Sequence, residues 1–132
     1  MSTLLFIGAL PDDREIYGFG LRTLGHEVLF ADADEAVSAA RTARPSAIIL
    51  HIAQGDHWDI GDALRQTCGD IPVIVLTAAV RPDRQNRDRA RHMVNCAAFV
   101  GKPCTPDGLA LVIHRVISGE RRIELASGID CG

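Results

Sequence analysis

Three side chains that could handle a phosphoryl group or a proton stand at the ends of apolar runs in this chain. His51 follows the run 47–50, Thr77 follows the run 73–76, and Lys102 comes soon after the run 98–100. An imidazole can accept a phosphoryl group, bind a metal (here with His57) or sense pH, while a hydroxyl and an ammonium group can bind an anion. Against these roles we favour a packed, hydrogen-bonded His51, because a lone histidine at a strand end is more often structural.

The apolar runs predict the strands that would position these side chains. They are apolar at successive rather than alternate positions, which is typical of strands buried on both faces. Longer amphipathic segments alternate with them, so we expect an α/β fold with a parallel sheet and helices on both sides. The predicted strands are 4–7, 28–30, 47–50, 73–76 and 98–100, and the predicted helices are 12–24, 34–43, 57–68, 82–95 and 105–118.

The ends of the helices are marked by residues that begin or terminate them. Pro11 suits a first helical position, and Gly25 suits the residue after a helix. Asp32 or Asp34 could cap the second helix, and Thr105 with Pro106 could open the fifth. The carboxyl ends of parallel strands form the edge where function concentrates, so loops there are the first place to look.

Two glycines, Gly18 and Gly20, lie inside the first predicted helix. Glycine in a helix interior costs about 1 kcal/mol relative to alanine. Close packing of this helix against the sheet would explain both residues.

Size and composition indicate one ordinary globular domain. The 132 residues are 47% hydrophobic and 23% charged, with a net charge of −3, which gives no general attraction to nucleic acid or to an anionic membrane. We find neither a membrane-length apolar segment nor the pattern of a signal peptide, and we expect a cytoplasmic protein. We assign residues 1–120 to the domain and residues 121–132 to a helix extension or tail. The four cysteines form no CxxC pair, so we expect reduced thiols rather than zinc or disulfides.

Three motifs carry a resemblance to a known family. They are Arg-Pro-Ser-Ala-Ile-Ile-Leu-His at 44–51, Pro-Val-Ile-Val-Leu-Thr-Ala at 72–78 and Phe-Val-Gly-Lys-Pro at 99–103. Over residues 3–120 the chain resembles the receiver domains of two-component response regulators, the CheY-like proteins. The resemblance implies a flavodoxin-like fold, with a five-stranded parallel sheet in the order 2-1-3-4-5 and five helices on its two faces.

The resemblance also assigns roles to individual residues. His51 occupies the position of the phospho-acceptor aspartate, and Gly8 and Ala9 occupy the positions of the acidic pair that holds the metal. Pro11 and Arg14 match the family's first loop without a gap. The family's switch and phosphate-reading residues are kept as Thr77, Phe99, Lys102 and Pro103.

These substitutions remove the chemistry of a standard receiver. Phosphoryl transfer to a receiver needs a carboxylate nucleophile and a divalent cation, and Mg²⁺ takes hard oxygen ligands. Gly8 and Ala9 offer only backbone atoms, and His51 offers nitrogen. We therefore expect no catalytic residue, no enzyme activity, no bound Mg²⁺ or other cofactor, and no metal site. Asp12 and Asp13 lie about one helical turn further on, where we expect them to support the helix N-terminus rather than bind a metal.

Three functions remain as hypotheses. We favour an atypical receiver, or pseudo-receiver, that acts as a protein–protein interaction and signalling module without aspartate phosphorylation. The second hypothesis is a phosphorylatable receiver that uses a substitute carboxylate, Asp12 or Asp56. The third is a small flavodoxin-like ligand-binding protein, although residues 8–11 lack a Gly-rich phosphate loop and Cys104 is only a weak nucleophile candidate. We expect Thr77 to bond locally and Lys102 to reach solvent or an acidic side chain such as Asp56, rather than an anion.

The fourth predicted helix carries a basic face. Arg84, Arg87 and Arg91 share that face at helical spacing. A solvated helix surface would explain them equally well. The resemblance implies a signalling partner that docks on helix 4, strand 5 and helix 5, and a basic patch there would favour an acidic protein over nucleic acid. A homodimer is also open, whereas a membrane partner is not expected.

Overall fold

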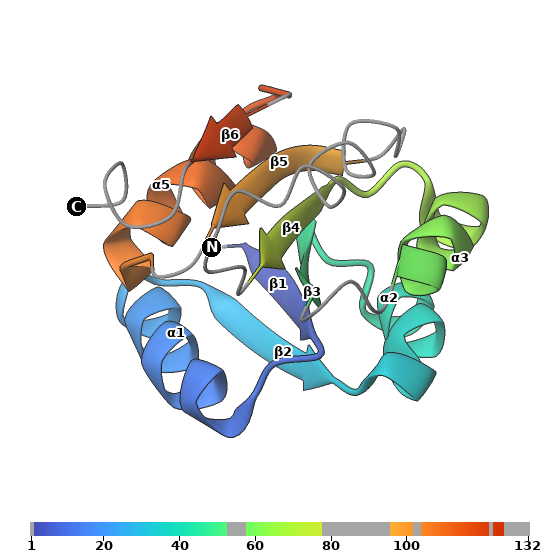
Figure 1. Ribbon diagram of the computed structural model, residues 1–132, viewed down its shortest axis with the longest axis horizontal. Coiled ribbons are helices and arrows are strands. Elements are labelled where there is room, and N and C mark those ends of the chain that lie inside the picture. The colour runs from blue at the N-terminus through green and yellow to red at the C-terminus, as the bar shows by residue number, and fades with distance from the viewer. Residues whose placement is uncertain (1, 53–57, 78–95, 102–103, 122, 126–132) are drawn as a thin grey trace.

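The computed structural model describes residues 2–52, 58–77, 96–101, 104–121 and 123–125. Strands and helices alternate along these residues (Figure 1). The strands are β1 (Thr3–Ile7), β2 (Glu27–Ala31), β3 (Ala47–Ile52), β4 (Val73–Thr77), β5 (Cys96–Gly101) and β6 (Ile123–Leu125). The helices are α1 (Pro11–Thr23), α2 (Ala36–Ala43), α3 (Trp58–Cys68) and α5 (Pro106–Ile117), with a 3-10 turn over Ala33–Glu35 before α2.

All strand pairs are parallel, and the sheet has the order β2-β1-β3-β4-β5-β6. The predicted α/β class and the order of the first five strands are therefore confirmed. The prediction of five strands is wrong, because β6 adds a sixth beside β5. The prediction of five helices also differs from the structure, which has four α-helices in the part it describes. The expected helix over 82–95, with Arg84, Arg87 and Arg91, lies outside the described residues.

The sixth strand comes from the segment that we expected to extend the last helix or to form a tail. Helix α5 ends at Ile117, and Gly119 follows with φ 109°, a left-handed conformation that reverses the chain. Ile123 then packs into the core, which places the residues after the turn alongside β5. The domain boundary near residue 120 remains a prediction.

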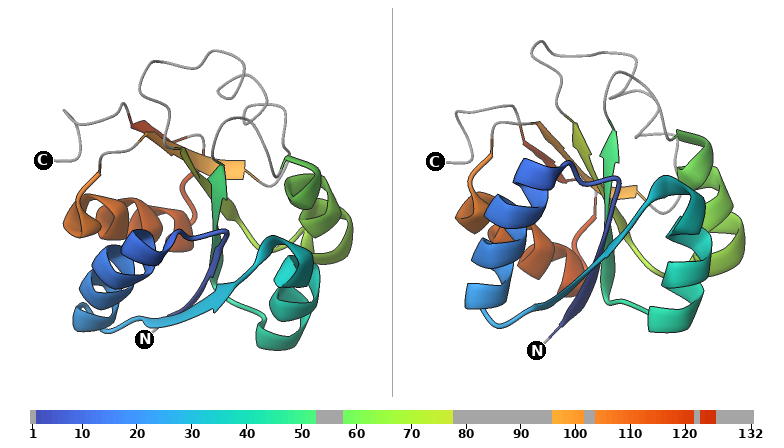
Figure 2. Two further views of the ribbon diagram at one scale, coloured as in Figure 1. Left: turned by 60° about the horizontal axis from the view of Figure 1, so that its bottom comes forward. Right: turned by 90° about the horizontal axis from the view of Figure 1, so that it is seen from below.

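The sheet is covered on both faces, as its apolar runs predicted. Helices α1 and α5 lie on one side, and α2 and α3 lie on the other (Figure 2). Along β1, Leu4 and Phe6 enter the core on the α1 side, while Leu5 and Ile7 enter the core on the α2 side. This alternation explains why successive positions of the strands are apolar.

Most of the predicted helix ends are confirmed. Pro11 is at the start of α1, and Gly25 has φ 96° just after its end. The hydroxyl of Thr105 accepts a hydrogen bond of 3.0 Å from the backbone N–H of Gly108, which caps α5. The predicted aspartate cap on the second helix is wrong. The Asp32 carboxylate makes no cap bond and instead accepts a hydrogen bond of 3.2 Å from Arg14.

The two helical glycines lie where α1 is pressed against its neighbours. A Cβ atom on Gly18 would come within 2.9 Å of the tip of the Phe30 ring on β2. A Cβ atom on Gly20 would come within 2.4 Å of Pro106 Cβ at the start of α5. Close packing therefore accounts for both glycines, against the sheet at Gly18 and against α5 at Gly20. None of the helices in the described ranges combines the length and apolar character needed to cross a membrane.

Candidate functional site

A buried histidine and a buried aspartate meet at the carboxyl end of the sheet. His51 lies within β3 and pairs in register with Leu76 of β4. Its side chain is 1% exposed, and its Nε2 atom lies 3.8 Å from Oδ2 of Asp13, whose side chain is 7% exposed. The arrangement agrees with the expectation of a packed His51, with an ionisable partner that we did not foresee.

The alternation of β3 explains how these two side chains come together. Ala47 and Ile49 point toward the layer formed by α1 and α5, whereas Ile48, Leu50 and Ile52 point toward α2 and α3. His51 has the parity of Ile49, so it faces α1. Asp13 reaches it from the first turn of that helix.

Asp13 makes a contact that the sequence analysis did not predict. Both Asp12 and Asp13 lie in the first turn of α1, as expected. However, Asp12 is exposed, whereas Asp13 is buried and faces His51. The sequence carried a signal for this difference, because Asp13 opens the buried row that continues at Tyr17 and Leu21 with a spacing of four residues.

A second contact that the sequence did not reveal joins α1 to the segment after β5. The buried hydroxyl of Tyr17 donates a hydrogen bond of 2.6 Å to the backbone carbonyl of Cys104. Cys104 immediately follows Lys102 and Pro103, which lie outside the described residues. Tyr17 therefore fixes the residue after the Lys-Pro pair to the same helix that carries Asp13.

We predict that Tyr17→Phe lowers the free energy of unfolding by about 1–2 kcal/mol, because the buried Cys104 carbonyl loses a donor. Urea denaturation would measure this loss. Thr23→Ala is the matched control, since the Thr23 hydroxyl donates to a backbone carbonyl of the same helix, that of Phe19, at 2.8 Å in an exposed position. A loss in Tyr17→Phe no larger than that in the control would contradict the positioning role.

The acidic-pair positions carry no side-chain oxygen. Gly8 has φ 76°, and its N–H donates a hydrogen bond of 3.1 Å to the carbonyl of Ala31, which continues the ladder between β1 and β2. Ala9 is partly buried against the core. Among the described residues at this edge, Asp13 alone places a carboxylate beside His51, a poorer set of oxygen ligands than Mg²⁺ usually takes.

The residues that match the family's switch lie apart from the histidine–aspartate pair. Thr77 ends β4 and is 2% exposed, and the alternation of the strand directs it to the side of Val75, opposite His51. Phe99 is 7% exposed and packs in that same core layer. Their roles in switching stay predictions. Cys104, the weak nucleophile candidate, is buried, and its Sγ atom donates to the carbonyl of Thr105 at 3.5 Å.

An exposed acidic group lies on the turn after β2. Within the described ranges, carboxylate oxygens of Asp32, Asp34 and Glu35 lie within 4.8 Å of one another. All three residues are exposed, and the Asp32 carboxylate already binds Arg14. We assign no metal to this group.

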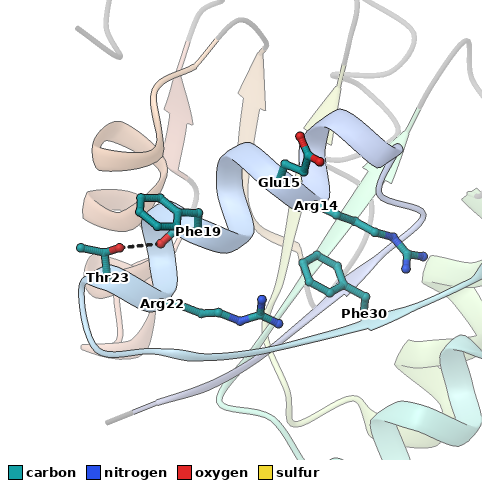
Figure 3. A pocket seen from close by; sticks show the side chains of 6 residues that line it. All are labelled: Arg14, Glu15, Phe19, Arg22, Thr23 and Phe30. Carbon is teal, nitrogen blue, oxygen red and sulfur yellow. Dashed lines mark hydrogen bonds between the residues drawn. The ribbon is translucent and has the colours of Figure 1, made fainter.

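A shallow groove of about 830 Å³ runs along the outer side of α1 (Figure 3). The guanidinium groups of Arg14 and Arg22 lie 5.2 and 5.5 Å from the centre of the Phe30 ring. Both are already engaged, Arg14 by Asp32 and Arg22 by the carbonyl of Val28 at 2.9 Å. We assign the groove no ligand for that reason. Its lining residues are Arg14, Glu15, Phe19, Arg22, Thr23 and Phe30.

Comparison with solved structures identifies the fold. No protein-family model and no curated protein matches the chain. NtrX from Brucella abortus is similar with a TM-score of 0.77 and 24% identity over 89% of this chain, which spans 26% of the NtrX chain. CheY4 from Vibrio cholerae has a TM-score of 0.74 and 24% identity over 88% of this chain and 98% of its own. A LuxR-family response regulator from Aurantimonas sp. has a TM-score of 0.74 and 20% identity over 95% of this chain and 89% of its own. The chain therefore has the fold of a response regulator receiver domain.

Proposed function

We propose that this chain is an atypical receiver domain, which regulates a signalling partner without accepting a phosphoryl group on aspartate. The observation that carries the proposal is the buried pair of His51 and Asp13, 3.8 Å apart at the acceptor position. In this proposal the side chain at the acceptor position is the His51 imidazole, which packs against the Asp13 carboxylate. It is neither a carboxylate nucleophile nor a hard oxygen ligand for a metal.

The chemistry of the neighbouring residues supports the same proposal. A transferring phosphoryl group needs positive charge beside it, which a divalent cation supplies in standard receivers. Gly8 and Ala9 bring no carboxylates that could hold such a cation, and the Asp13 carboxylate adds negative charge beside His51. In this proposal the domain is not an enzyme, binds no Mg²⁺ and works through its surface.

The partner surface in this proposal includes helix α5. Leu111 is 60% exposed and Ile117 is 38% exposed on that helix, so apolar contact area is available to a protein partner. The basic residues Arg84, Arg87 and Arg91, which would extend the surface toward an acidic partner, lie outside the described residues. We propose a signalling protein in the cytoplasm as the partner, rather than nucleic acid or a membrane.

The proposal predicts that acetyl phosphate and Mg²⁺ leave the chain unmodified. Intact-mass analysis should show no added phosphoryl group under conditions that label a conventional receiver. The Ala9→Asp/His51→Asp variant tests whether the missing carboxylates are the cause. It places a carboxylate at the acceptor position and one at the acidic-pair positions, while Gly8 stays unchanged. Labelling of that variant alone would support the proposal, and stoichiometric labelling of the wild-type chain would overturn it.

The second candidate function is phosphorylation on a substitute carboxylate. Of the two carboxylates that we predicted for this role, Asp12 is exposed and Asp56 lies outside the described residues. We propose Asp13 instead, because its carboxylate is buried beside His51. If the wild-type chain were labelled, Asp13→Asn would abolish the label and Asp12→Asn would retain it. Loss of the label in His51→Asn alone would instead identify phosphohistidine.

A further inference from the structure

Strand β6 pairs with β5, a strand whose edge has no residue that would hinder pairing with another chain. Strand β5 reads Cys-Ala-Ala-Phe-Val-Gly, with neither a charge nor a proline along its length. An uncharged apolar edge offers free backbone groups to the strand of another chain. Here Ala98, Phe99 and Val100 are in register with Ile123, Glu124 and Leu125, so the edge is already paired within the chain.

The side chain of Ile123 anchors β6 in the core. Ile123 is 6% exposed and belongs to the core layer that contains Val112 and Val116 of α5. Glu124 has the opposite parity, is exposed, and places a charge on the edge that β5 lacks. Three residues of pairing and one buried isoleucine make β6 the smallest strand of the sheet.

A single glycine turn holds β6 on its own β5. The N–H of Gly119 donates to the carbonyl of Val116, and the N–H of Glu120 donates to the carbonyl of Arg115, both at 3.0 Å. Arg115 and Glu120 also form an ion pair of 2.8 Å. The reversal requires φ 109° at Gly119, a conformation that side-chain-bearing residues rarely adopt.

We propose that β6 is an exchangeable strand and that two copies of this chain can form a dimer in which each β6 pairs with β5 of the other copy. The occupant is a second copy because the β5 edge and the Ile123 site already fit the sequence of β6. The exchanged strand would make the same contacts as the internal one, so only the hinge differs between the two forms. Exchange between copies is thereby controlled at Gly119.

Gly119→Val in the full chain tests the proposal. A valine at this φ strains the closed turn of the monomer, and an extended hinge relieves the strain. The exchanged dimer should therefore become more stable relative to the monomer. We expect the association constant of the dimer to rise at least about tenfold, measured by sedimentation after refolding over a range of protein concentrations. Gly25→Val is the matched control, since Gly25 has φ 96° and likewise nothing within 4 Å, but it precedes β2, a strand that pairs with β1 and not with β5. The control should lose stability and stay monomeric.

Ile123→Asp tests whether the dimer forms through β6. In the Gly119→Val/Ile123→Asp double variant, β6 fits neither copy, and the dimer should be lost. Cys96 at the start of β5 reports on the same pairing, because burial and, to a smaller extent, the nearby Glu124 carboxylate raise the pKa of its thiol to about 11. Peptide-resolved alkylation of Cys96 should be slow in the wild type and in the exchanged dimer, and faster in Ile123→Asp alone.

Two results would overturn the proposal. One is a folded Gly119→Val chain that is monomeric at every concentration, and the other is a dimer that survives Ile123→Asp. If Gly119→Val does not fold, the Glu120→Ala variant keeps the test decisive, because it removes the ion pair to Arg115 without straining the backbone. That variant should shift the equilibrium in the same direction by a smaller factor, and an unchanged association constant would then refute exchange.

Discussion

Gly20→Ala should unfold at a lower urea concentration than the wild-type chain, although alanine is the better helix former. The added Cβ would lie 2.4 Å from Pro106 Cβ, a distance that forces α1 or the start of α5 to move. Overpacking of this kind typically costs about 1–3 kcal/mol. A contact as short as 2.4 Å belongs to the upper part of that range, about 2–3 kcal/mol. Alanine recovers about 1 kcal/mol of helix propensity, so we expect a net loss of about 1–2 kcal/mol in the free energy of unfolding.

Two neighbouring substitutions separate packing from propensity. Gly18→Ala meets only the tip of the Phe30 ring at 2.9 Å, which can rotate away, so its loss should be smaller. Glu15→Ala changes an exposed position of the same helix and should leave stability nearly unchanged. If Gly20→Ala were as stable as the wild type, the close contact between α1 and α5 would be refuted.

The second large effect should appear when the pair of Asp13 and His51 is broken. Each of Asp13→Ala and His51→Ala should lower the free energy of unfolding by about 1–3 kcal/mol, because each removes one polar partner from a buried contact. The double variant should lose less than the sum of the two. We expect a coupling energy of about 1–3 kcal/mol from the double-mutant cycle in urea.

The exposed ion pair between Arg44 and Asp70 provides the control cycle. Its N–O distance of 2.6 Å is shorter than that of the buried pair, but the two side chains are 55% and 65% exposed. Solvent screening should hold its coupling energy below about 1 kcal/mol. Additive losses at Asp13 and His51 would mean that burial alone, rather than their mutual contact, explains both residues.

The first five strands and the helices α1, α2, α3 and α5 could be predicted because each strand is an apolar run and each helix is an amphipathic segment. The apolar runs at residues 47–50 and 73–76 form most of β3 and β4. Pro11 and Thr105, which we expected at the starts of two helices, lie at the observed starts of α1 and α5. Strand β6 could not be predicted in this way. It has three residues, and its position depends on a turn for which Gly119 is the one indication in the sequence.

The chemical site was predictable in position but not in its contacts. Buried parallel strands place His51 and Thr77 at one end of the sheet whatever their partners are. The contact of Asp13 with His51 depends on which face of α1 turns inward, and the spacing of Asp13, Tyr17 and Leu21 could have indicated it. The bond from Tyr17 to Cys104 spans 87 residues and depends on tertiary packing that no local pattern encodes.

For the atypical receiver that we propose, the backbone at Gly8 would make the departure from standard receiver chemistry hard to reverse. Restoring an aspartate at position 51 would supply a nucleophile, but a standard metal site also needs carboxylates at positions 8 and 9. Position 8 has φ 76°, where a residue with a side chain costs about 1–3 kcal/mol. Of the three substitutions to aspartate, at positions 8, 9 and 51, the one at position 8 is therefore opposed by the backbone conformation. The Ala9→Asp/His51→Asp variant avoids this cost, but a designer who wanted both carboxylates of the acidic pair would have to rebuild the loop after β1.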